Sequence, residues 1–386
     1  MSASDTLLVF PRPPVSAAAE ALRGEVRTFL ARELADRPAV RRADSWSGYD
    51  PEFSRHMGQQ GWLGMTWPRQ YGGHERTGAE RYVVMEEMLA AGAPVGSHWI
   101  AERQSGPLLL KFGTEAQRAA VLPGIAAGET YVCIGMSEPD AGSDLAAVRT
   151  RAEPVDDGWR INGAKLWTTN AAACRYMILF CRTSGTREDR QRGTSQLLVD
   201  LTTPGIIIRP ITDISGGSHF NEVVFEDVLV PADALVGREG EGWTQVMSEL
   251  AYERSGPERF LSSFTLMVEL VRVLREHDRP AARAAVGRLV AQLIVLRRLS
   301  RGVAALLEEG VDPQLHASVV KDLGAVFEQE LPEVAQALVE CEPDLNAEGP
   351  FAAVLAHTIL NAPSFSLRGG TREVLRGIIA RGMGLR

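Results

Sequence analysis

The sequence predicts an α+β fold in three parts: an N-terminal all-α domain (residues 1–129), a middle β-domain with small barrel-like sheets (130–237) and a C-terminal helical bundle (238–386). Three observations predict it. Segments rich in Ala, Leu, Glu and Arg, with apolar residues three and four apart, occupy both ends of the chain and are typical of amphipathic helices. Between them, short β-prone runs alternate with turn signals. A glycine cluster at 237–242 then marks the return to helix, and we interpret it as a domain boundary.

The helices are expected between breaks made by glycine and proline. In the first domain the expected ranges are 16–34, 50–60, 78–91, 97–112 and 114–127. In the last domain long helical stretches are expected at 243–276, 281–309, 313–340 and 371–381, with short helices over 351–360. This pattern favours a helical bundle at the C-terminal end.

The middle domain opens with two hairpin signals, Pro154 to Gly158 and Asn162-Gly163. Further strands are expected at 176–180, 195–200, 205–211 and 222–229. A polar insert, residues 184–193, is most simply a surface hairpin loop.

Composition narrows the class of protein. The 386 residues are 45% hydrophobic and 23% charged, as in ordinary globular proteins, and the formal net charge of -8 argues against broad nucleic-acid binding. The four cysteines, at 133, 174, 181 and 341, show no C-x-x-C pair, so neither a zinc site nor a disulfide scaffold is indicated. The first residues lack a basic region, and no window is apolar for long enough to span a membrane. We therefore expect a cytoplasmic protein without membrane insertion.

Two segments of the middle domain have the composition of a ligand site. Residues 136–144, MSEPDAGSD, are dense in backbone donors and hydroxyls, and residues 167–170, WTTN, place an aromatic before two hydroxyls. Together they suit a flat, phosphate-bearing ligand. The alternative is an ordinary surface loop and a core tryptophan.

Both segments resemble the flavin-binding middle of the acyl-CoA dehydrogenase family, in which a [TS]-E-P-x-x-G-S-D loop precedes a W-[IT]-[TS] strand end. The resemblance covers nearly the whole chain and implies an FAD cofactor. It implies that the flavin ring is lined by residues of both segments, that Ser143 lies near the pyrophosphate and the acyl-CoA, and that the start of the last helix also contacts the cofactor. The implied cofactor residues are Ile134, Met136, Ser137, Ser143, Trp167, Thr168, Thr169, Gly370 and Thr371.

The family reaction removes two hydrogens from an acyl thioester and needs a carboxylate base. Many members carry a glutamate where this chain has Gly369, within Leu367 to Thr371. A minority branch, including the isovaleryl and long-chain enzymes, carries it on the helix after the sheet domain, and Glu253 matches that position. The resemblance therefore implies Glu253 as the base, the Gly369 amide as a donor to the thioester oxygen and Arg254 beside CoA.

Alternatives to this assignment remain open in the sequence. Glu253 is also interpretable as a solvated carboxylate paired with a nearby arginine, and Glu373 is a rival base. A related flavoprotein oxidase or monooxygenase that uses oxygen is a second interpretation of the chain. A third is a partner subunit without catalytic activity of its own, although the intact set of Ser137, Trp167, Thr169 and Glu253 argues against it.

The chain lacks two sequence motifs that, in most family members, bind the adenosine half of FAD in a neighbouring subunit. Residues 274–280 stand where family members have an R-F-G motif, and residues 346–350 stand where they have a Q-x-x-G-G motif. The absence of both motifs predicts that the chain forms a hetero-oligomer with a related subunit. The alternative is a homo-oligomer in which Arg275 or Arg279 replaces the missing contacts. The implied partners are an acyl-CoA substrate and electron-transfer flavoprotein or a similar acceptor.

Overall fold

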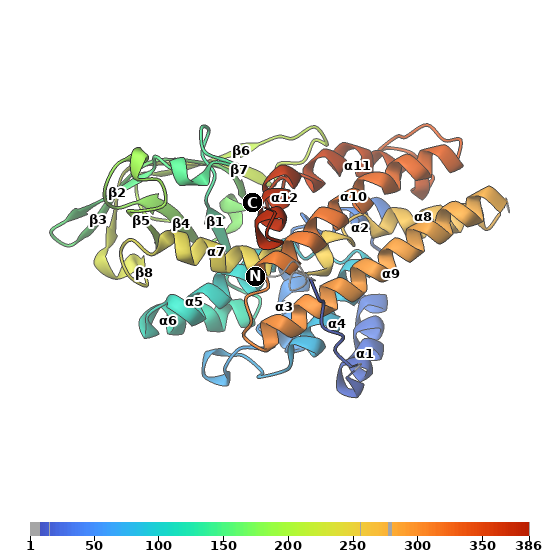
Figure 1. The fold of residues 1–386 in the computed structure, drawn as a ribbon, viewed down its shortest axis with the longest axis horizontal. Helices are drawn as coiled ribbons and strands as arrows, with labels where there is room; N and C mark the ends of the chain where they lie inside the picture. The colour runs from blue at the N-terminus through green and yellow to red at the C-terminus, as the bar shows by residue number, and fades with distance from the viewer. Residues whose placement is uncertain (1–7, 15, 255, 277–279, 386) are drawn as a thin grey trace. The chain divides into compact units, whose positions relative to one another are not determined.

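The computed structural model describes residues 8–14, 16–254, 256–276 and 280–385, with the side chains of 251 and 252 excepted. Contacts divide the chain into two compact units (Figure 1). The first, here the helical unit, comprises residues 1–49, 76–95 and 253–386. The second, here the sheet unit, comprises residues 50–75 and 96–252. Each is described by itself.

The helical unit is built from long helices whose ends follow local capping signals. α1 packs on α4, and α10 packs on α9, α11 and α12. Thr77 and Glu80 form a reciprocal capping box at the start of α4, which is why that helix begins at the predicted residue. The elements are α1 (Ala17–Glu33), α2 (Ala39–Ala43), α4 (Gly78–Ala91), η7 (Pro257–Arg259), α8 (Phe264–Leu274), α9 (Pro280–Glu308), α10 (Gln314–Leu338), α11 (Pro350–Phe365) and α12 (Arg372–Gly382).

Two helical predictions were wrong in detail. The stretch 243–276 is not continuous, because α7 (Gly242–Glu253) ends before Gly256-Pro257 and η7 and α8 follow separately. Proline removes a backbone donor and glycine favours non-helical backbone, so this dipeptide breaks the helix. The short helices expected over 351–360 are one helix of 16 residues, α11. Its Pro363 lies only in the last turn.

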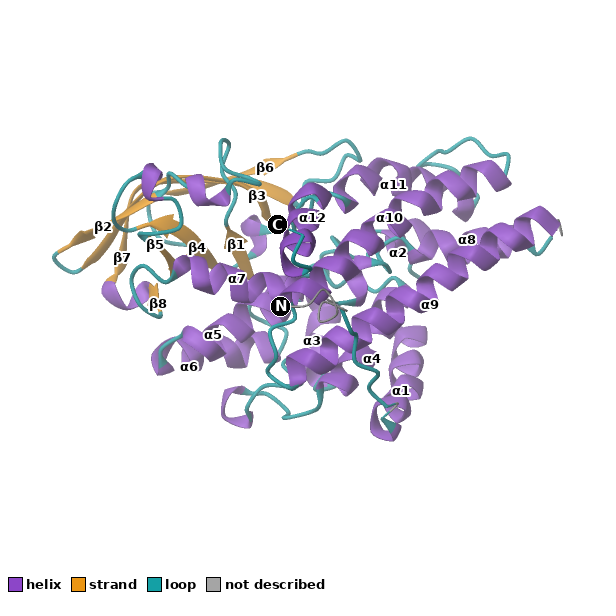
Figure 2. Cartoon of the chain, in the orientation of Figure 1, coloured by secondary structure: helices purple, strands orange, loops and turns teal. Residues whose placement is uncertain are grey.

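The sheet unit surrounds one eight-stranded sheet, drawn in orange in Figure 2. The strand order is β6-β7-β3-β2-β4-β5-β8, and β1 joins by pairing in parallel with β4. The strands are β1 (Val132–Gly135), β2 (Arg151–Val155), β3 (Gly158–Thr169), β4 (Tyr176–Arg182), β5 (Thr194–Asp200), β6 (Ile206–Ile211), β7 (Phe220–Pro231) and β8 (Leu235–Val236). The helices are α3 (Pro51–Gln59), η1 (Arg69–Tyr71), the π-helix η2 (Ala101–Ser105), α5 (Gly106–Phe112), α6 (Glu115–Ala126), η3 (Leu145–Ala147), η4 (Ala171–Ala173), η5 (Arg187–Asp189) and η6 (Ala232–Ala234), with α7 up to Tyr252.

One hairpin signal is confirmed and the other is wrong. Val155 pairs with Gly158, so Asp156-Asp157 is the turn of the β2–β3 hairpin. Asn162-Gly163 instead lies within β3, at a register shift against β7. The Asn162 side chain accepts a hydrogen bond from the Asp227 amide (2.9 Å) and donates one to the Asp227 carboxylate (3.1 Å). The register shift makes the dipeptide a β-bulge, and the partner strand β7 satisfies the polar side chain of Asn162 there.

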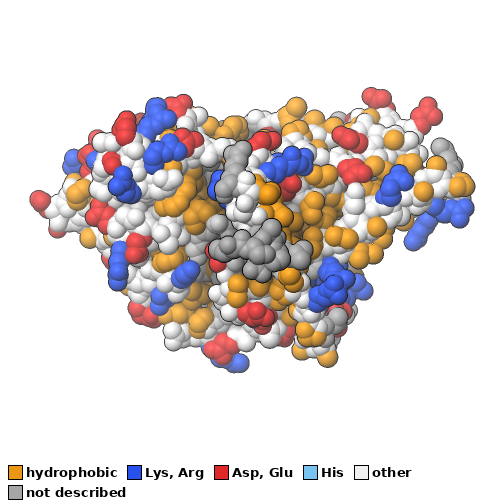
Figure 3. All heavy atoms as spheres, viewed as in Figure 1, with side chains coloured by type: hydrophobic (Ala, Val, Ile, Leu, Met, Phe, Trp, Pro, Cys, Tyr) orange, Lys and Arg blue, Asp and Glu red, His pale blue; other side chains and the backbone are white. Residues whose placement is uncertain are grey.

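The predicted surface loop 184–193 is confirmed between the antiparallel strands β4 and β5. In the described part of the chain, no helix combines the length and apolar character that a membrane span requires. On the face drawn in Figure 3, acidic and basic side chains are interspersed.

Candidate functional site

The loop that follows β1 is fixed against β3 through its backbone carbonyls. The Lys165 Nζ atom donates to the Met136 carbonyl at 3.0 Å, and the Leu166 amide donates to the Ser137 carbonyl at 2.9 Å. Met136 packs against Val148 and Phe180, whereas Ser137 is only partly buried. β3 thus holds the backbone of the predicted flavin-lining loop.

A buried ion pair completes this loop. Lys165 Nζ lies 2.8 Å from Glu138 Oε1, with the two side chains 0% and 5% exposed. Glu138 also accepts from the backbone amides of Arg149 (2.7 Å) and Thr150 (2.9 Å). Burial raises the pKa of Glu138, but Lys165 and these donors outweigh it and hold the pKa below the ordinary value. Glu138 therefore carries the negative charge that Lys165 neutralises.

The other predicted residues of the loop region differ in exposure. Ile134 is half-buried in β1 and packs against the core that contains Val132 and Ile178. Ser143 is exposed. Its neighbour Asp144 forms a two-contact ion pair with Arg190 of the loop before β5. That pair ties the Ser143 segment to the insert.

Trp167 is not a core aromatic, since it is 54% exposed. Its φ of 61° lies in the left-handed region, at a register shift between β3 and β7. Its ring makes an edge contact with Phe220 at 5.9 Å between centroids. A bulky residue with positive φ is uncommon and costs free energy, and such strain clusters at functional sites. The indole is therefore presented outward by the bulge.

Thr168 and Thr169 point to different environments. Thr168 is buried, and its Oγ1 has no hydrogen-bond partner within the described residues. Its carbonyl accepts from the Asn221 side chain at 3.2 Å. Thr169 is half-buried and pairs with Phe220. Of the two, Thr169 is the one available beside Trp167.

The predicted residues of the helical unit converge on two arginines. Arg259 Nη2 lies 3.0 Å from Glu253 Oε1, and Arg259 Nε donates to the Glu253 carbonyl at 2.8 Å. Arg254 Nε donates to the Gly369 carbonyl at 2.9 Å. A Cβ atom at Gly369 would lie 3.0 Å from Arg259 Nη2, and one at Gly370 would lie 3.2 Å from Arg254 Nη2. The structure thus brings Glu253, Arg254, Gly369 and Gly370 together.

Thr371 and Glu373 lie at the start of α12. Thr371 Oγ1 accepts from the Val374 amide at 3.4 Å and caps the helix. Glu373 is exposed, and hydrogen bonds from its own backbone and from Thr371 hold its pKa below the ordinary value. Because its carboxylate is exposed to water, Glu373 is a poorer candidate for the base than Glu253, whose side chain is 17% exposed.

Sequence reasoning missed three charged residues of the site. Lys165 and Glu138 hold the flavin-side loop, and Arg259 holds Glu253. Two signals were available: a lysine two residues before the strand-end tryptophan, and a second arginine close after Glu253.

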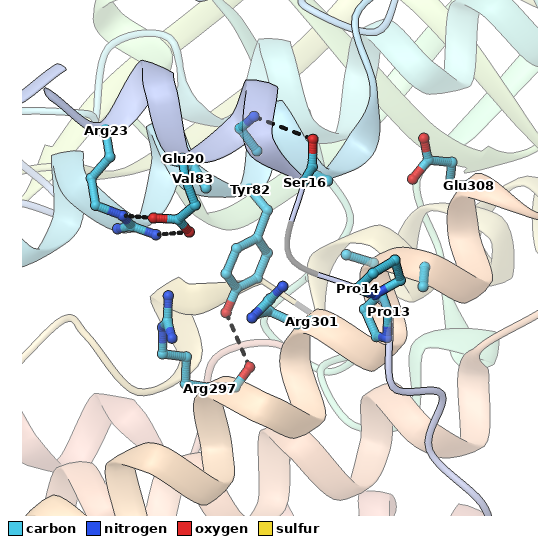
Figure 4. Close-up of a pocket in the computed structure, with 14 residues that line it drawn as sticks. Pro13, Pro14, Ser16, Glu20, Arg23, Tyr82, Val83, Arg297, Arg301 and Glu308 are labelled. Carbon is cyan, nitrogen blue, oxygen red and sulfur yellow. Dashed lines mark hydrogen bonds and ion pairs between the residues drawn. The ribbon is translucent and has the colours of Figure 1, made fainter. Parts of the chain in front are cut away.

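A separate pocket lies in the helical unit between the segment before α1, α1, α4 and α9 (Figure 4). Arg23 there pairs with Glu20, and Arg297 pairs with Glu86. No predicted site residue lines this pocket. Elsewhere in the described ranges, no group of three or more His, Cys, Asp or Glu side chains is placed to hold a metal ion.

Comparison with known proteins decides the family. A model described as the acyl-CoA dehydrogenase N-terminal domain matches residues 16–129, and the corresponding middle-domain model matches residues 133–228. Acyl-CoA dehydrogenase IpdE1 of Mycobacterium tuberculosis is 33% identical over 373 residues, which cover 94% of this chain and 96% of that relative. The chain belongs to the acyl-CoA dehydrogenase family. It is therefore an oxidoreductase of the class that acts on CH–CH groups.

Other family members align with different fractions of this dehydrogenase. The mitochondrial isovaleryl-CoA dehydrogenase of Pongo abelii is 34% identical over 238 residues, 60% of this chain and 56% of that relative. A solved structure named Tcur3481-Tcur3483 steroid ACAD is 28% identical, covers 97% of this chain and 98% of that chain, and has a TM-score of 0.83. The ChsE4-ChsE5 complex from Mycobacterium tuberculosis is 28% identical with a TM-score of 0.81, covering 96% of this chain and 97% of that chain. These similarities confirm the predicted fold class.

Proposed function

We propose that this dehydrogenase uses FAD to convert an acyl-CoA thioester into the trans-2-enoyl-CoA, with Glu253 as the base. One observation carries the proposal. Glu253 Oε1 and the position of a Cβ at Gly369 both lie 3.0 Å from the same atom, Arg259 Nη2. The two sequence positions that carry the base in different family branches therefore converge in space. In this chain only one of them, 253, bears a carboxylate.

The residues of the sheet unit fit a flavin. An exposed indole held outward by a strained backbone suits a flat aromatic ring, because aromatic faces bind by stacking. The half-buried Ser137 and Thr169 add hydroxyls beside it. Trp167, Ser137 and Thr169, with Ile134 and Met136, would hold the ring, and Ser143 would contact the pyrophosphate. FAD, when bound, supplies the hydride acceptor for the reaction.

Three groups of the chain act on the acyl thioester in this proposal. The Glu253 carboxylate takes the proton from the carbon beside the carbonyl. The Gly369 amide donates a hydrogen bond to the thioester oxygen, where negative charge develops as the proton leaves. Arg254 binds the CoA portion of the substrate through its positive charge.

We further propose that the enzyme works as a hetero-oligomer with a related subunit. The region 274–280 lacks the R-F-G motif that usually contacts a neighbour's FAD, and residues 346–350, which run into α11, lack the Q-x-x-G-G motif. Residues 277–279, including Arg279, lie outside the described residues. One structural relative is a complex of ChsE4 with ChsE5, and another is named for two components, Tcur3481 and Tcur3483, which supports this assembly.

The reaction is tested with the purified enzyme and its co-expressed partner, titrated anaerobically with acyl-CoA thioesters of linear, branched and ring-containing acyl groups. We expect bleaching of the flavin absorbance by at least one of them, with formation of the 2-enoyl-CoA detected by mass spectrometry. A flavin that stays oxidised with every thioester contradicts the proposed reaction. If air is then admitted and reoxidises the reduced flavin as fast as the substrate reduced it, coupling to a protein acceptor is contradicted.

A further inference from the structure

We propose that Arg259 is the positioning residue of the catalytic base: it holds the Glu253 carboxylate in the orientation that receives the substrate proton. This inference rests on the proposed function of Glu253. It assigns a role to a residue outside the motifs that identify the family.

Arg259 binds Glu253 at two points. Its Nη2 donates to Oε1 at 3.0 Å, and its Nε donates to the backbone carbonyl at 2.8 Å. Glu253 is the last residue of α7, where carbonyls have no partner within the helix. A guanidinium is a planar fork that donates in fixed directions, so two contacts to one residue fix both its backbone and its side chain. The carboxylate thus has little freedom to rotate.

The guanidinium is itself held on several sides. Arg259 is 0% exposed and lies over the Trp46 ring at 5.5 Å. The Gly369 backbone closes another side, since a Cβ there would lie 3.0 Å from Nη2 and 3.1 Å from Cζ. Gly324 admits the Arg259 backbone, because a Cβ at that glycine would lie 2.1 Å from the Arg259 carbonyl oxygen. Arg259 is therefore closely confined, and a side chain at position 369 would force its guanidinium to shift by a few tenths of an ångström.

The charges around Arg259 leave Glu253 as its closest acidic partner. Glu258 lies 3.9 Å from Arg259 Nε, and Glu328 is bound by Arg368 at 3.2 Å. Burial, and then the charges of Arg259 and Arg368, lower the pKa of Lys321 to about 7. The charged groups of this cluster are Glu253, Arg254, Glu258, Arg259, Lys321, Glu328 and Arg368.

Arg368 offers a matched control. It is a largely buried arginine in the same cluster and also lies over Trp46, at 4.6 Å, but its ion pair is with Glu328. Replacing either arginine by lysine disturbs the packing and hydrogen bonds of this buried cluster, whereas only replacement of Arg259 removes a contact to Glu253.

The test compares Arg259→Lys, Arg259→Gln and Arg368→Lys in the complete enzyme. Measurements are thermal stability, flavin content, the Kd for a non-reactive acyl-CoA analogue, the anaerobic rate of flavin bleaching, and its isotope effect with substrate deuterated beside the carbonyl. For both Arg259 variants we expect a fall of the bleaching rate by about 10- to 100-fold, the effect typical of misplaced catalytic groups, with Arg259→Lys less affected. The isotope effect should rise while the Kd and flavin content stay within about threefold of the parent enzyme. Crystal structures of the variants should show the Glu253 carboxylate displaced.

An Arg259→Lys enzyme with the parent bleaching rate and isotope effect overturns the inference, and so does an equal loss in Arg368→Lys. Glu253→Gln, measured beside them, separates this result from the proposed function. If Glu253→Gln bleaches at the parent rate, Glu253 is not the base; if it is inactive while Arg259→Lys is unaffected, only the positioning role is lost.

Discussion

Lys165 and Glu138 form an ion pair 2.8 Å long between the interior of β3 and the loop that carries Met136 and Ser137. Both side chains are almost fully buried. A buried pair is weak evidence for net stability, since desolvation offsets much of the attraction, but removing one partner strands an uncompensated charge. The pair therefore fixes the loop, but the stability of the fold then depends on both residues being present.

We predict that Lys165→Met lowers the free energy of unfolding by about 3–5 kcal/mol, because the Glu138 carboxylate remains buried without its cation. The double variant Glu138→Gln/Lys165→Met should recover part of that loss, since no charge is left buried. Denaturant titration of the three proteins checks this. A double variant less stable than Lys165→Met contradicts a coupled pair.

Trp167→Ala and Thr169→Val should lower the flavin bound per chain or shift its absorbance bands, because both side chains are proposed to contact the ring. Trp167 is 54% exposed, so the free energy of unfolding should change by less than about 1 kcal/mol. Leu229→Ala, at a residue of the same sheet that is 57% exposed, is the control and should retain the parent spectrum. Unchanged flavin content and spectrum in both site variants would refute the placement of the ring.

The buried His98 should make the enzyme acid-labile. Burial lowers the pKa of His98 to about 4, against about 6.5 in an unfolded chain. Between these values the unfolded chain binds more protons, so the free energy of unfolding falls as pH falls from about 6.5 to about 4, by about 3 kcal/mol in total. His98→Gln should reduce this slope, because the group that takes up the proton on unfolding is removed. Equal slopes for parent and His98→Gln in denaturant titrations at several pH values contradict the assignment.

Expressed alone, the chain should purify with less than one FAD per chain, because without the R-F-G and Q-x-x-G-G motifs it lacks contacts to the adenosine half of FAD. Co-expression with a related subunit from the same genome should raise occupancy and give a complex containing both chains. Flavin absorbance per chain and mass in solution measure this. Full occupancy in a homo-oligomer of this chain alone contradicts the hetero-oligomer.

Much of the fold was predictable because its signals are local. Capping by Thr77 and the turn at Asp156-Asp157 need only neighbouring residues, so α4 and the β2–β3 hairpin follow from the sequence. Asn162-Gly163 was misread because its partner, Asp227, lies 65 residues away. Local chemistry does not show which strand satisfies such a side chain.

The site was predictable in residue type but not in geometry. Strict alternation along β3 places Lys165 and Trp167 on one face, whereas the register shift buries the first and exposes the second. The contact between Arg259 and Glu253 needs the break after α7 to turn the chain back. Both features depend on backbone irregularities, which hydrophobic periodicity does not encode.

The central claim is that Glu253 removes the substrate proton, and anaerobic single-turnover bleaching of Glu253→Gln tests it most directly. The amide has the size of the carboxylate but does not accept the proton, so the rate should fall by about 10²–10⁴ while flavin content and acyl-CoA binding stay near the parent values. Glu373→Gln, at the exposed rival position, should bleach at nearly the parent rate. The opposite pattern, an active Glu253→Gln and an inactive Glu373→Gln, would contradict the assignment of the base.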